Sequence, residues 1–542
     1  LERCNYYKVI NKYRVAGMEV DEMESGLVAG ADGDVVVRDS DITEGKATIR
    51  CGQGQKTFYN PAQEVNRDVS VIGIQTFIER ELSGSGKVNI LEAMAASGIR
   101  SIRYAKEIDN VDSILANDFS QQAVESLKEN CKLNGTSKVL SSYEDASLLM
   151  FNKRNTFSVA DLDPYGSPMP FLESILQCVK DGGMLLVTAT DMAVLAGGNT
   201  PESCFAKYGS MSVKSKACQE LALRILIHAV QSVANRYGKF VVPLVSLKID
   251  FYVRIFFRVL HSPILCKQSA IQTAMFYQCT GCHSLSFQPL AAKKGSNHFV
   301  CPRGPPVGQR CNICESSFNF GGPIWNGPIH DKNFVEHMQQ NVSSAKYNYL
   351  GTRRRLEGLL QVVQEETEDP LLYDISQLSS VLRSTVIPIL TFRSAILNLG
   401  YKVSSSHTGP GTFKTNAPNE VIWQIFWSWH QQGHGSQLKS GTPGLNVLNY
   451  FAKNEPPVKV SFEKHPDANP ASRQMGALRY QINPTKNWGP GVRNAFDANE
   501  VSQAKSKVEV PARNNPNVNS SLQNPIIPPK KPKHSDEAQD VT

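Results

Sequence analysis

The sequence predicts an α/β protein whose doubly wound, mostly parallel sheet is followed by an α+β carboxyl-terminal region with a metal site. Short apolar segments alternate with helical patterns from Val88 to Leu186, which is typical of a parallel α/β sheet. Two Cys-x-x-Cys pairs follow this region, and such pairs indicate metal binding. Hydrophobic residues make up 41% of the 542 residues and charged residues 20%, which excludes a mainly disordered or fibrous protein.

The first part of the sheet is predicted from two consecutive strand-helix units. The apolar strand Val88–Leu91 is followed by apolar residues at helical spacing from Ile99 to Ile108. A second strand, Ser113–Ala116, precedes a helix that Ser120 can cap and Gly135 can close. Consecutive units of this kind build a parallel sheet with helices on its faces.

The rest of the sheet region continues the pattern. We expect strands at Phe157–Ala160 and Met184–Ala189, a long amphipathic helix from Ser215 to Tyr237, and strands at Phe240–Val245 and Phe251–Val259. This first domain is expected to end near residues 269–274.

The carboxyl-terminal half has helical patterns between Pro323 and Trp429, including Leu371–Leu399. The segments Lys402–Ser404 and Thr412–Thr415 flank a glycine turn and are expected to form a hairpin, so helices with a basic hairpin suggest a winged-helix type of module. Beyond about Gly491 the chain becomes rich in Asn, Pro, Lys and Ser, which predicts a disordered tail. The predicted domains are residues 1–275, 276–325 with the cysteine pairs, 326–490, and the tail 491–542.

Charge and hydropathy limit the classes of partner. Lys and Arg exceed Asp and Glu to give a formal net charge of +7, which is compatible with a polyanionic partner but does not require one. The most apolar long segment, Phe240–Leu260, contains four charged residues, so we expect no membrane span. Twelve cysteines are too few in so long a chain for a disulfide scaffold, which favours a reducing compartment.

Acidic residues end the predicted strands, where an open α/β sheet binds ligands. The turn Glu92–Gly98 contains small residues but lacks Gly-x-Gly-x-x-Gly. Asp118 lies 26 residues after Glu92, close to the spacing at which an acid meets ribose hydroxyls. Asp145 follows a possible third strand and could meet an adenine edge. Each acid taken alone is more often a helix cap or a surface charge, but together they predict a site for a ribose-bearing ligand.

The segment Asp161–Gly166 is the most informative motif. An exocyclic amine on a nucleobase is a poor nucleophile because its lone pair is delocalised into the ring. The Asp163 carboxylate and the Pro164 carbonyl could accept hydrogen bonds from such an amine, while Tyr165 supplies a stacking face. The alternative is an ordinary Asp-Pro turn with a surface tyrosine.

Further motifs occur in order along the chain up to about Pro490. They are Phe58–Pro61, Asn66–Asp68, Glu92–Arg100, Asn117-Asp118, Asp161–Pro168, Thr190–Leu195, Lys207–Gly209, the cysteine segment, Gly321–Pro323, Pro328–Asp331, Asp467–Pro470 and Asn487–Pro490. Together they closely resemble the tRNA (guanine-26-N2)-dimethyltransferase family. The resemblance implies a Rossmann-like class I domain that uses S-adenosylmethionine (SAM), and tRNA as the methyl acceptor at N2 of one guanine.

The same resemblance implies the roles of individual residues. It implies SAM contacts for Arg67, Arg100, Asp118, Asp145 and Ala146, a catalytic role for Asp163 in its Asp163-Pro164-Tyr165 motif, and stacking of the flipped guanine for Phe58 and Tyr165. Arg67 and Arg100 could instead form structural ion pairs.

The two cysteine pairs predict a structural zinc site with Cys279, Cys282, Cys311 and Cys314 as ligands. Cys301, His283 and His298 lie nearby and are competing ligands. A redox dithiol is the alternative for either pair alone.

Candidates for contacts with tRNA phosphates are Arg353–Arg355, Lys293-Lys294, Arg393, Lys402 and Lys414. We infer no obligate protein partner. The lysine cluster Lys530–Lys533 favours the nucleus, and the mitochondrion and cytoplasm stay open because the amino terminus could be missing. Two other functions remain possible, methylation of a different amine and a catalytically silent tRNA-binding protein.

Overall fold

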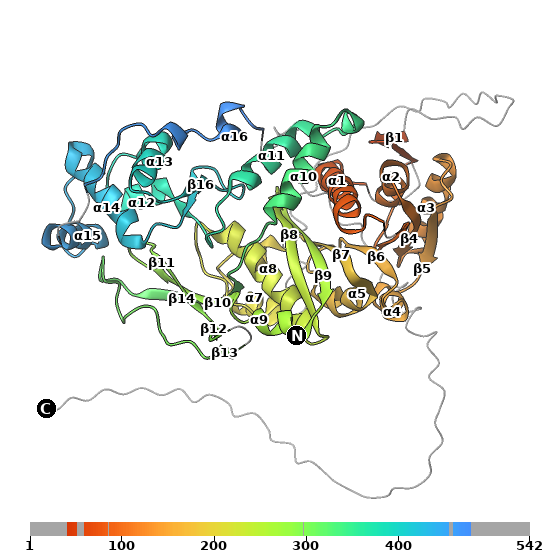
Figure 1. Cartoon of the computed structure of the whole chain (residues 1–542), viewed down its shortest axis with the longest axis horizontal. Helices are drawn as coiled ribbons and strands as arrows, with labels where there is room; N and C mark the ends of the chain where they lie inside the picture. The colour runs from red at the N-terminus through yellow and green to blue at the C-terminus, as the bar shows by residue number, and fades with distance from the viewer. Residues whose placement is uncertain (1–40, 51–58, 85, 296–297, 455–458, 479–542) are drawn as a thin grey trace, which may run out of the picture. The chain divides into compact units, whose positions relative to one another are not determined.

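The computed structural model describes residues 41–50, 59–84, 86–295, 298–454 and 459–478 (Figure 1). Phe58, the motif Asn487–Pro490 and the predicted tail lie outside the described residues.

The centre of the fold is a seven-stranded sheet. Its strands are β3 (Val88–Glu92), β4 (Val111–Asp118), β5 (Val139–Tyr143), β6 (Phe157–Leu162), β7 (Val179–Ala189), β8 (Lys239–Ile249) and β9 (Tyr252–His261). They lie in the order β5-β4-β3-β6-β7-β9-β8. Strands β3 to β7 pair in parallel, and β9 is antiparallel to both β7 and β8. The prediction of a doubly wound sheet is confirmed, and the strand order reverses between β3 and β6.

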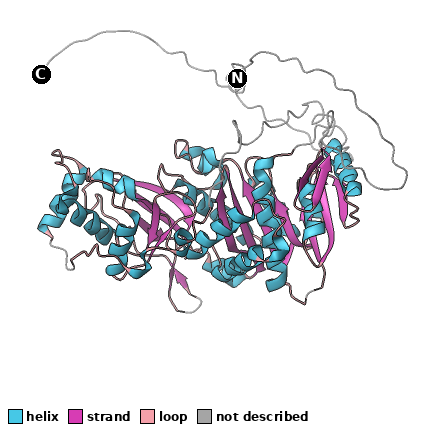
Figure 2. Cartoon of the chain, turned by 90° about the horizontal axis from the view of Figure 1, so that it is seen from above, coloured by secondary structure: helices cyan, strands magenta, loops and turns pink. Residues whose placement is uncertain are grey.

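Helices cover both faces of this sheet (Figure 2). They include α1 (Glu64–Glu81), α2 (Ile99–Glu107), α3 (Gln121–Leu133), α4 (Ala146–Asn152), α5 (Leu172–Cys178), α6 (Met192–Leu195), α7 (Pro201–Tyr208), α8 (Cys218–Asn235) and α9 (Pro263–Gln268). Apolar residues of α4, α5 and α8 form a core with one face, and those of α1 form a core with the other. The long helix expected from Ser215 to Tyr237 is confirmed as α8.

The sequence of strand β9 is mostly apolar because both faces of the strand are covered by cores. Val253 and Ile255 belong to the core on one face, whereas Tyr252 and Phe256 belong to the core on the other. Because alternate side chains point to opposite faces and both faces are covered, every residue from 252 to 257 is buried. Phe251, which we expected to begin this strand, is instead exposed in the preceding turn.

A small hairpin lies against the first strand-helix units and was not predicted. It consists of β1 (Asp41–Glu44) and β2 (Ala47–Arg50), which pair antiparallel. The backbone N–H groups of Thr48 and Arg50 donate to the side chains of Asn134 and Asn130, each over 2.9 Å. These bonds attach the hairpin to α3.

The cysteine pairs lie beside a second sheet of three antiparallel strands. Its strands are β10 (Thr273–Cys279), β11 (Leu285–Pro289) and β14 (Phe318–Trp325), in the order β11-β10-β14, and β12 (Ala292–Lys293) pairs with β13 (Phe299–Val300) beside it. The next helices, α10 (Lys332–Ser343) and α11 (Arg353–Glu365), pack on α1 and join the core on its face of the first sheet.

The last described part combines helices with three short strands. Its elements are β15 (Tyr373–Asp374), α12 (Ile375–Val381), α13 (Ile389–Asn398), β16 (Val403–Ser405), β17 (Thr412–Thr415), α14 (Asn419–Trp429), α15 (Pro443–Lys453) and α16 (Ala471–Gln474). The predicted hairpin is confirmed as β16 and β17, to which β15 adds a third strand. The pattern at Leu371–Leu399 is divided into one strand and two helices, because Pro388 begins a new helix rather than continuing α12.

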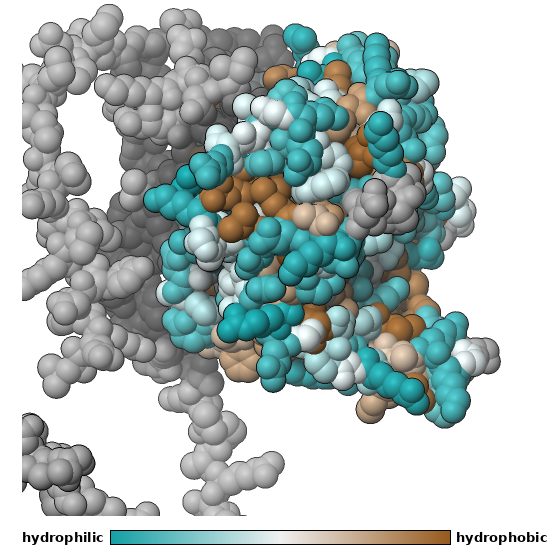
Figure 3. Space-filling model, turned by 90° about the vertical axis from the view of Figure 1, so that its left-hand side faces the viewer, coloured by the Kyte–Doolittle hydropathy of each residue, from teal (hydrophilic) through white to brown (hydrophobic). Residues whose placement is uncertain are grey.

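The face that carries α14 and α15 is mostly hydrophilic, with separate apolar areas (Figure 3). Apolar side chains of α12, α13 and α14 are turned inward, where they form a core with the four cysteines of the predicted zinc site. Among the described helices, none combines the length and the apolar character needed to cross a membrane.

Candidate active site

The acidic residues predicted to form a site end neighbouring strands of the central sheet. In the register of β3, Glu92 lies opposite Ala116 of β4 on one side and Asp161 of β6 on the other. Asp118 ends β4, and Asp163 follows directly after β6. The strand order therefore brings these carboxylates to one edge, beside the reversal point at which open α/β sheets bind ligands.

The turn after β6 is attached to the end of β7. The backbone N–H of Gly166 donates to Thr190 Oγ1 over 2.7 Å, and the N–H of Thr190 donates to the carbonyl of Gly166 over 2.9 Å. Gly166 has a φ of 80°, a conformation that favours glycine. This turn buries Pro164 and leaves Tyr165 49% exposed, so the ring of Tyr165 is accessible to a planar ligand.

Asp163 is held by two neighbours through one of its oxygens. Arg100 donates to Oδ2 in a close ion pair, and Asn66 donates to the same oxygen over 3.3 Å. Within the described residues no group donates to Oδ1 of Asp163 or to the carbonyl oxygen of Pro164. The site therefore offers two adjacent hydrogen-bond acceptors on an oriented turn.

Arg100 lies among several carboxylates and is almost fully buried. Its guanidinium is 3.7 Å from Glu92 and 3.5 Å from Asp161, and it donates to Ser70 Oγ over 3.2 Å. Burial opposes the charge, but the neighbouring carboxylates of Asp161 and Asp163 outweigh it and hold the pKa of Arg100 well above its usual value. Arg100 is thus a permanent cation that orients Asp163.

A buried ion pair between Arg254 and Asp161 supports this site and was not predicted from the sequence. Arg254 of β9 donates to both oxygens of Asp161, over 2.7 and 2.9 Å, and Tyr104 donates to Asp161 over 2.6 Å. Burial acts to raise the pKa of Asp161, but Arg254 and Arg100 outweigh it and lower the pKa. The available signal was an arginine between the apolar residues Val253 and Ile255 of β9, since a buried cation requires a buried partner.

Asp118 and Asp145 both bind backbone N–H groups. Asp118 accepts from Ala96 over 2.8 Å and from Ser120 over 2.9 Å, and burial raises its pKa. Asp145 caps α4 by accepting from Leu148 over 3.0 Å, and Ala146 next to it is buried. No cation is bonded to either carboxylate within the described residues, so both can still accept ligand hydroxyl or amine groups.

Arg67 is bound to the amino-terminal hairpin in this structure. It donates to both oxygens of Glu44, over 2.6 and 2.5 Å, and its guanidinium lies 5.1 Å from the centre of the Tyr59 ring. The ion-pair alternative holds for the contacts of Arg67 and of Arg100 in this structure. Their contact with SAM stays a prediction.

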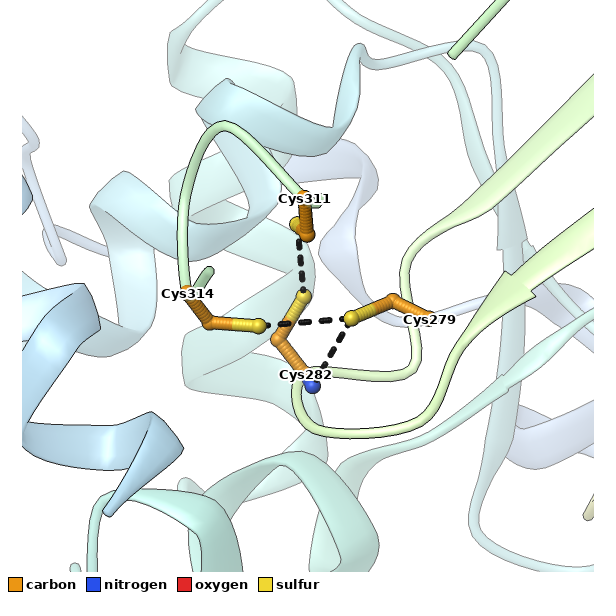
Figure 4. A group of neighbouring side chains, drawn as sticks. All are labelled: Cys279, Cys282, Cys311 and Cys314. Carbon is orange, nitrogen blue, oxygen red and sulfur yellow. Dashed lines mark hydrogen bonds between the residues drawn. The ribbon is translucent and has the colours of Figure 1, made fainter. Parts of the chain in front are cut away.

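The four cysteines of the predicted zinc site converge from two similar turns (Figure 4). The Sγ atoms of Cys279 and Cys314 are 3.3 Å apart, and those of Cys282 and Cys311 are 3.6 Å apart. Zn–S bonds of about 2.3 Å in a tetrahedron place sulfur atoms about 3.8 Å apart, so this set needs little adjustment to hold a zinc ion. His283, His298 and Cys301 lie outside the group.

The sequence matches a family of known proteins over most of its length. Residues 34–427 match the family model described as N2,N2-dimethylguanosine tRNA methyltransferase. The chain belongs to this family. A Drosophila melanogaster tRNA (guanine(26)-N(2))-dimethyltransferase is 41% identical over 88% of this chain and 89% of its own length. A Mus musculus protein of the same name is 38% identical over 83% and 76%.

A solved structure has the same fold as this family member. Trm1 from Pyrococcus horikoshii, in complex with S-adenosyl-L-methionine, is 27% identical and superposes with a TM-score of 0.61. The match covers 70% of this chain and 98% of the Pyrococcus chain. The Rossmann-like methyltransferase class that we expected is thereby confirmed.

A second buried group in this family member, His330, Glu366 and His407, has the residue types of a metal site. Backbone N–H groups donate to Nε2 of His407 and to Nδ1 of His330, each over 3.3 Å. A neutral ring whose one nitrogen accepts a hydrogen bond carries its proton on the other nitrogen. Nδ1 of His407, which lies 2.6 Å from Glu366, therefore carries the proton of a neutral ring, and Lys414 lies 3.6 Å from Glu366. The group is a buried polar network rather than a metal centre.

Several residues predicted to bind tRNA phosphates have other partners in this family member. Lys414 is buried and 3.1 Å from Glu220, Arg355 pairs with Asp250 over 2.7 Å, and Arg353 pairs with Glu357 over 2.9 Å. The prediction for Lys414 and Arg355 was wrong, because both complete buried ion pairs. Exposed candidates are Lys293, Lys294, Arg354 and Lys402, and Arg393 is buried beside a cavity.

Proposed function

We propose that this chain transfers methyl groups from SAM to the exocyclic N2 amine of guanine 26 in tRNA and forms N2,N2-dimethylguanosine. The observation that carries the proposal is the pair of acceptors at the end of β6. Oδ1 of Asp163 and the carbonyl oxygen of Pro164 have no donor among the described residues. An amine with two hydrogens fits such a pair.

The acceptors raise the reactivity of N2 by holding it in place. Hydrogen bonds from N2 to Asp163 and Pro164 fix the amine and favour the electron density on nitrogen that attack requires. Tyr165 provides a face on which the flipped guanine can stack. Arg100 holds Asp163 through Oδ2, which leaves Oδ1 directed to the substrate.

The residues present fit SAM. The turn between β3 and α2 contains mainly small residues, and the Asp118 carboxylate at the end of β4 can accept ribose hydroxyls as well as its two backbone N–H groups. SAM, when bound, would supply its sulfonium methyl group: the S–CH3 bond breaks as the bond to N2 forms, S-adenosylhomocysteine leaves, and the proton lost from N2 passes to the Asp163 carboxylate that accepts its hydrogen bond. We propose SAM contacts for Arg67, Arg100, Asp118, Asp145 and Ala146, and stacking of the guanine for Phe58 and Tyr165.

Two successive transfers need no second site. The free amine has two hydrogens for two acceptors, and the monomethylated amine has one hydrogen, which needs only one of them. The other position is then free for the first methyl group.

The zinc site is proposed to be structural. Cys279, Cys282, Cys311 and Cys314 form a closed donor set, which leaves no open coordination position for a substrate. A nuclear location is also proposed, from the lysine-rich segment outside the described residues.

The test is transfer of a labelled methyl group from SAM to unmodified tRNA transcripts with guanine or adenine at position 26. We expect label only with guanine. SAM binding without label in either transcript would contradict the proposal and favour a silent tRNA-binding protein, and label in the adenine transcript would favour a different amine.

A further inference from the structure

A cavity in the carboxyl-terminal part of the chain lies outside the site described above. Its volume is about 360 Å³, and it lies between α11, α13, β16 and the segment around α16, elements that pack together (Figure 1). Its lining residues include two arginines, Arg393 and Arg473, and two serines, Ser405 and Ser472, but no carboxylate. The cavity therefore has a positive charge.

Arg393 is a buried cation with little compensation. It is 6% exposed, and its Nε donates to the carbonyl of Ala468 over 2.6 Å. Within the described residues, its other two nitrogens have no hydrogen-bond partner, and no carboxylate lies within salt-bridge distance. Buried guanidinium groups usually pair with an anion, so an anionic ligand would complete the bonds of this side chain.

The nearest opposite charge, Glu365, is occupied elsewhere. Both of its oxygens bind Ser472, from the backbone N–H over 2.7 Å and from Oγ over 2.5 Å. Glu365 thus fixes the segment that carries Arg473, and although its charge acts on Arg393, the two side chains form no salt bridge. Arg473 is exposed and has no side-chain partner among the described residues, which leaves one arginine inside the cavity and one at its surface.

We propose that this cavity binds a backbone phosphate of the tRNA, with Arg393 as the buried donor and Arg473 as the surface donor. Two guanidinium groups and the hydroxyl of Ser405, with no carboxylate in the lining, match a phosphate diester. The inference rests on the proposed function for the identity of the RNA. It adds a contact that holds the tRNA body away from the base that is methylated.

The test compares tRNA binding by Arg473→Glu, Arg393→Gln and the wild-type chain over a range of salt concentrations. Arg154→Glu is the matched control, since Arg154 is exposed in the loop before β6 and has no side-chain partner among the described residues. We expect Arg393→Gln to raise the Kd for tRNA about 10-fold and Arg473→Glu to raise it as well. Each variant should also lower the slope of log Kd against log salt concentration by about 1.

Measurements of tRNA binding and of methyl transfer distinguish a failure of the proposed phosphate site from a failure of the proposed function. SAM affinity and kcat at saturating tRNA should not change in Arg473→Glu. Wild-type Kd and salt slope in Arg473→Glu would overturn the proposed phosphate site, even if Arg393→Gln did not fold, while methyl transfer would still support the function. A chain that transfers no methyl group but loses tRNA affinity in both variants would overturn the function and leave the phosphate site standing.

Discussion

The role proposed for Asp163 depends on an arrangement that no single residue provides. Its Oδ2 is bound by Arg100 and Asn66, and its Oδ1 is open to a substrate amine. The backbone of the next residue adds a second acceptor. Charge, orientation and the turn geometry therefore come from three different segments, α1, α2 and the end of β6.

Replacement of Asp163 by Asn should separate catalysis from cofactor binding. We expect kcat to fall at least about 100-fold, because the variant replaces a charged acceptor by a weaker one in a preorganised site. SAM affinity should change little. Single-turnover methyl transfer and calorimetric SAM binding measure the two effects.

Asp112→Asn is the matched control, since Asp112 is an exposed residue near the amino-terminal end of β4. Turnover by Asp163→Asn within a few-fold of this control would refute the role of Asp163.

Some residues of the site can be predicted from the sequence and others cannot. Asp163, Pro164 and Tyr165 stand next to each other, so a local motif with a chemical rationale was enough to select them. Arg254 and Glu44 could not be selected in this way, because their partners Asp161 and Arg67 are distant in the sequence and only the strand order brings them together. Phe58 lies outside the described residues.

The amino-terminal hairpin depends on one buried carboxylate. Burial raises the pKa of Glu44, but the charges and hydrogen bonds of Arg67 and Arg103 outweigh it and bring the pKa to about 2 from 4.5. A carboxyl group whose pKa is lowered on folding stabilises the protein above the unfolded pKa, and this stability is lost as pH falls through the folded pKa. The contribution is about 3 kcal/mol near pH 7.

Glu44→Gln should therefore lower Tm at pH 7 by roughly 3 °C, and the difference from wild type should narrow as pH falls from about 4.5 to 2. Calorimetry over this pH range provides the measurement, with the exposed Glu125→Gln as control. A difference that does not depend on pH would show that the carboxylate of Glu44 is not the source of the stability.

A second prediction concerns the two turns that carry the four cysteines of the zinc site. The purified chain should contain one zinc ion, and Cys314→Ser should lose it and lower Tm by roughly 5–10 °C, because binding of a structural metal contributes to folding. Elemental analysis and thermal unfolding measure both. Cys301→Ser should behave as wild type, since Cys301 is exposed and outside the group. Full zinc content in Cys314→Ser would exclude this ligand set.

Buried ion pairs join segments that are far apart along the whole chain. Lys414 of β17 pairs with Glu220 of α8, and Arg224 of α8 donates to the carbonyls of Trp325 and Gly327, each over 2.9 Å. The helices α10 and α11 also pack over the first sheet. The domain boundaries expected from the sequence stay a prediction, because periodicity and composition do not show which faces of distant segments pack together.

Lys414→Met tests these connections. Removal of the cation leaves the carboxylates of Glu220 and Glu366 buried with less compensation, at a cost of about 3–5 kcal/mol, so Tm should fall by roughly 3–6 °C. Thermal unfolding measures this, with the exposed Lys402→Met as the matched control. Equal stability of the two variants would show that the buried lysine does not hold the segments together.

The most direct test of the account is nucleoside analysis by mass spectrometry after exhaustive reaction of the chain with SAM and a tRNA transcript that has guanine at position 26. The pair of acceptors formed by Asp163 and Pro164 predicts N2,N2-dimethylguanosine at that position. Methylation at a ring nitrogen of guanine, or at another position of the tRNA, would contradict it.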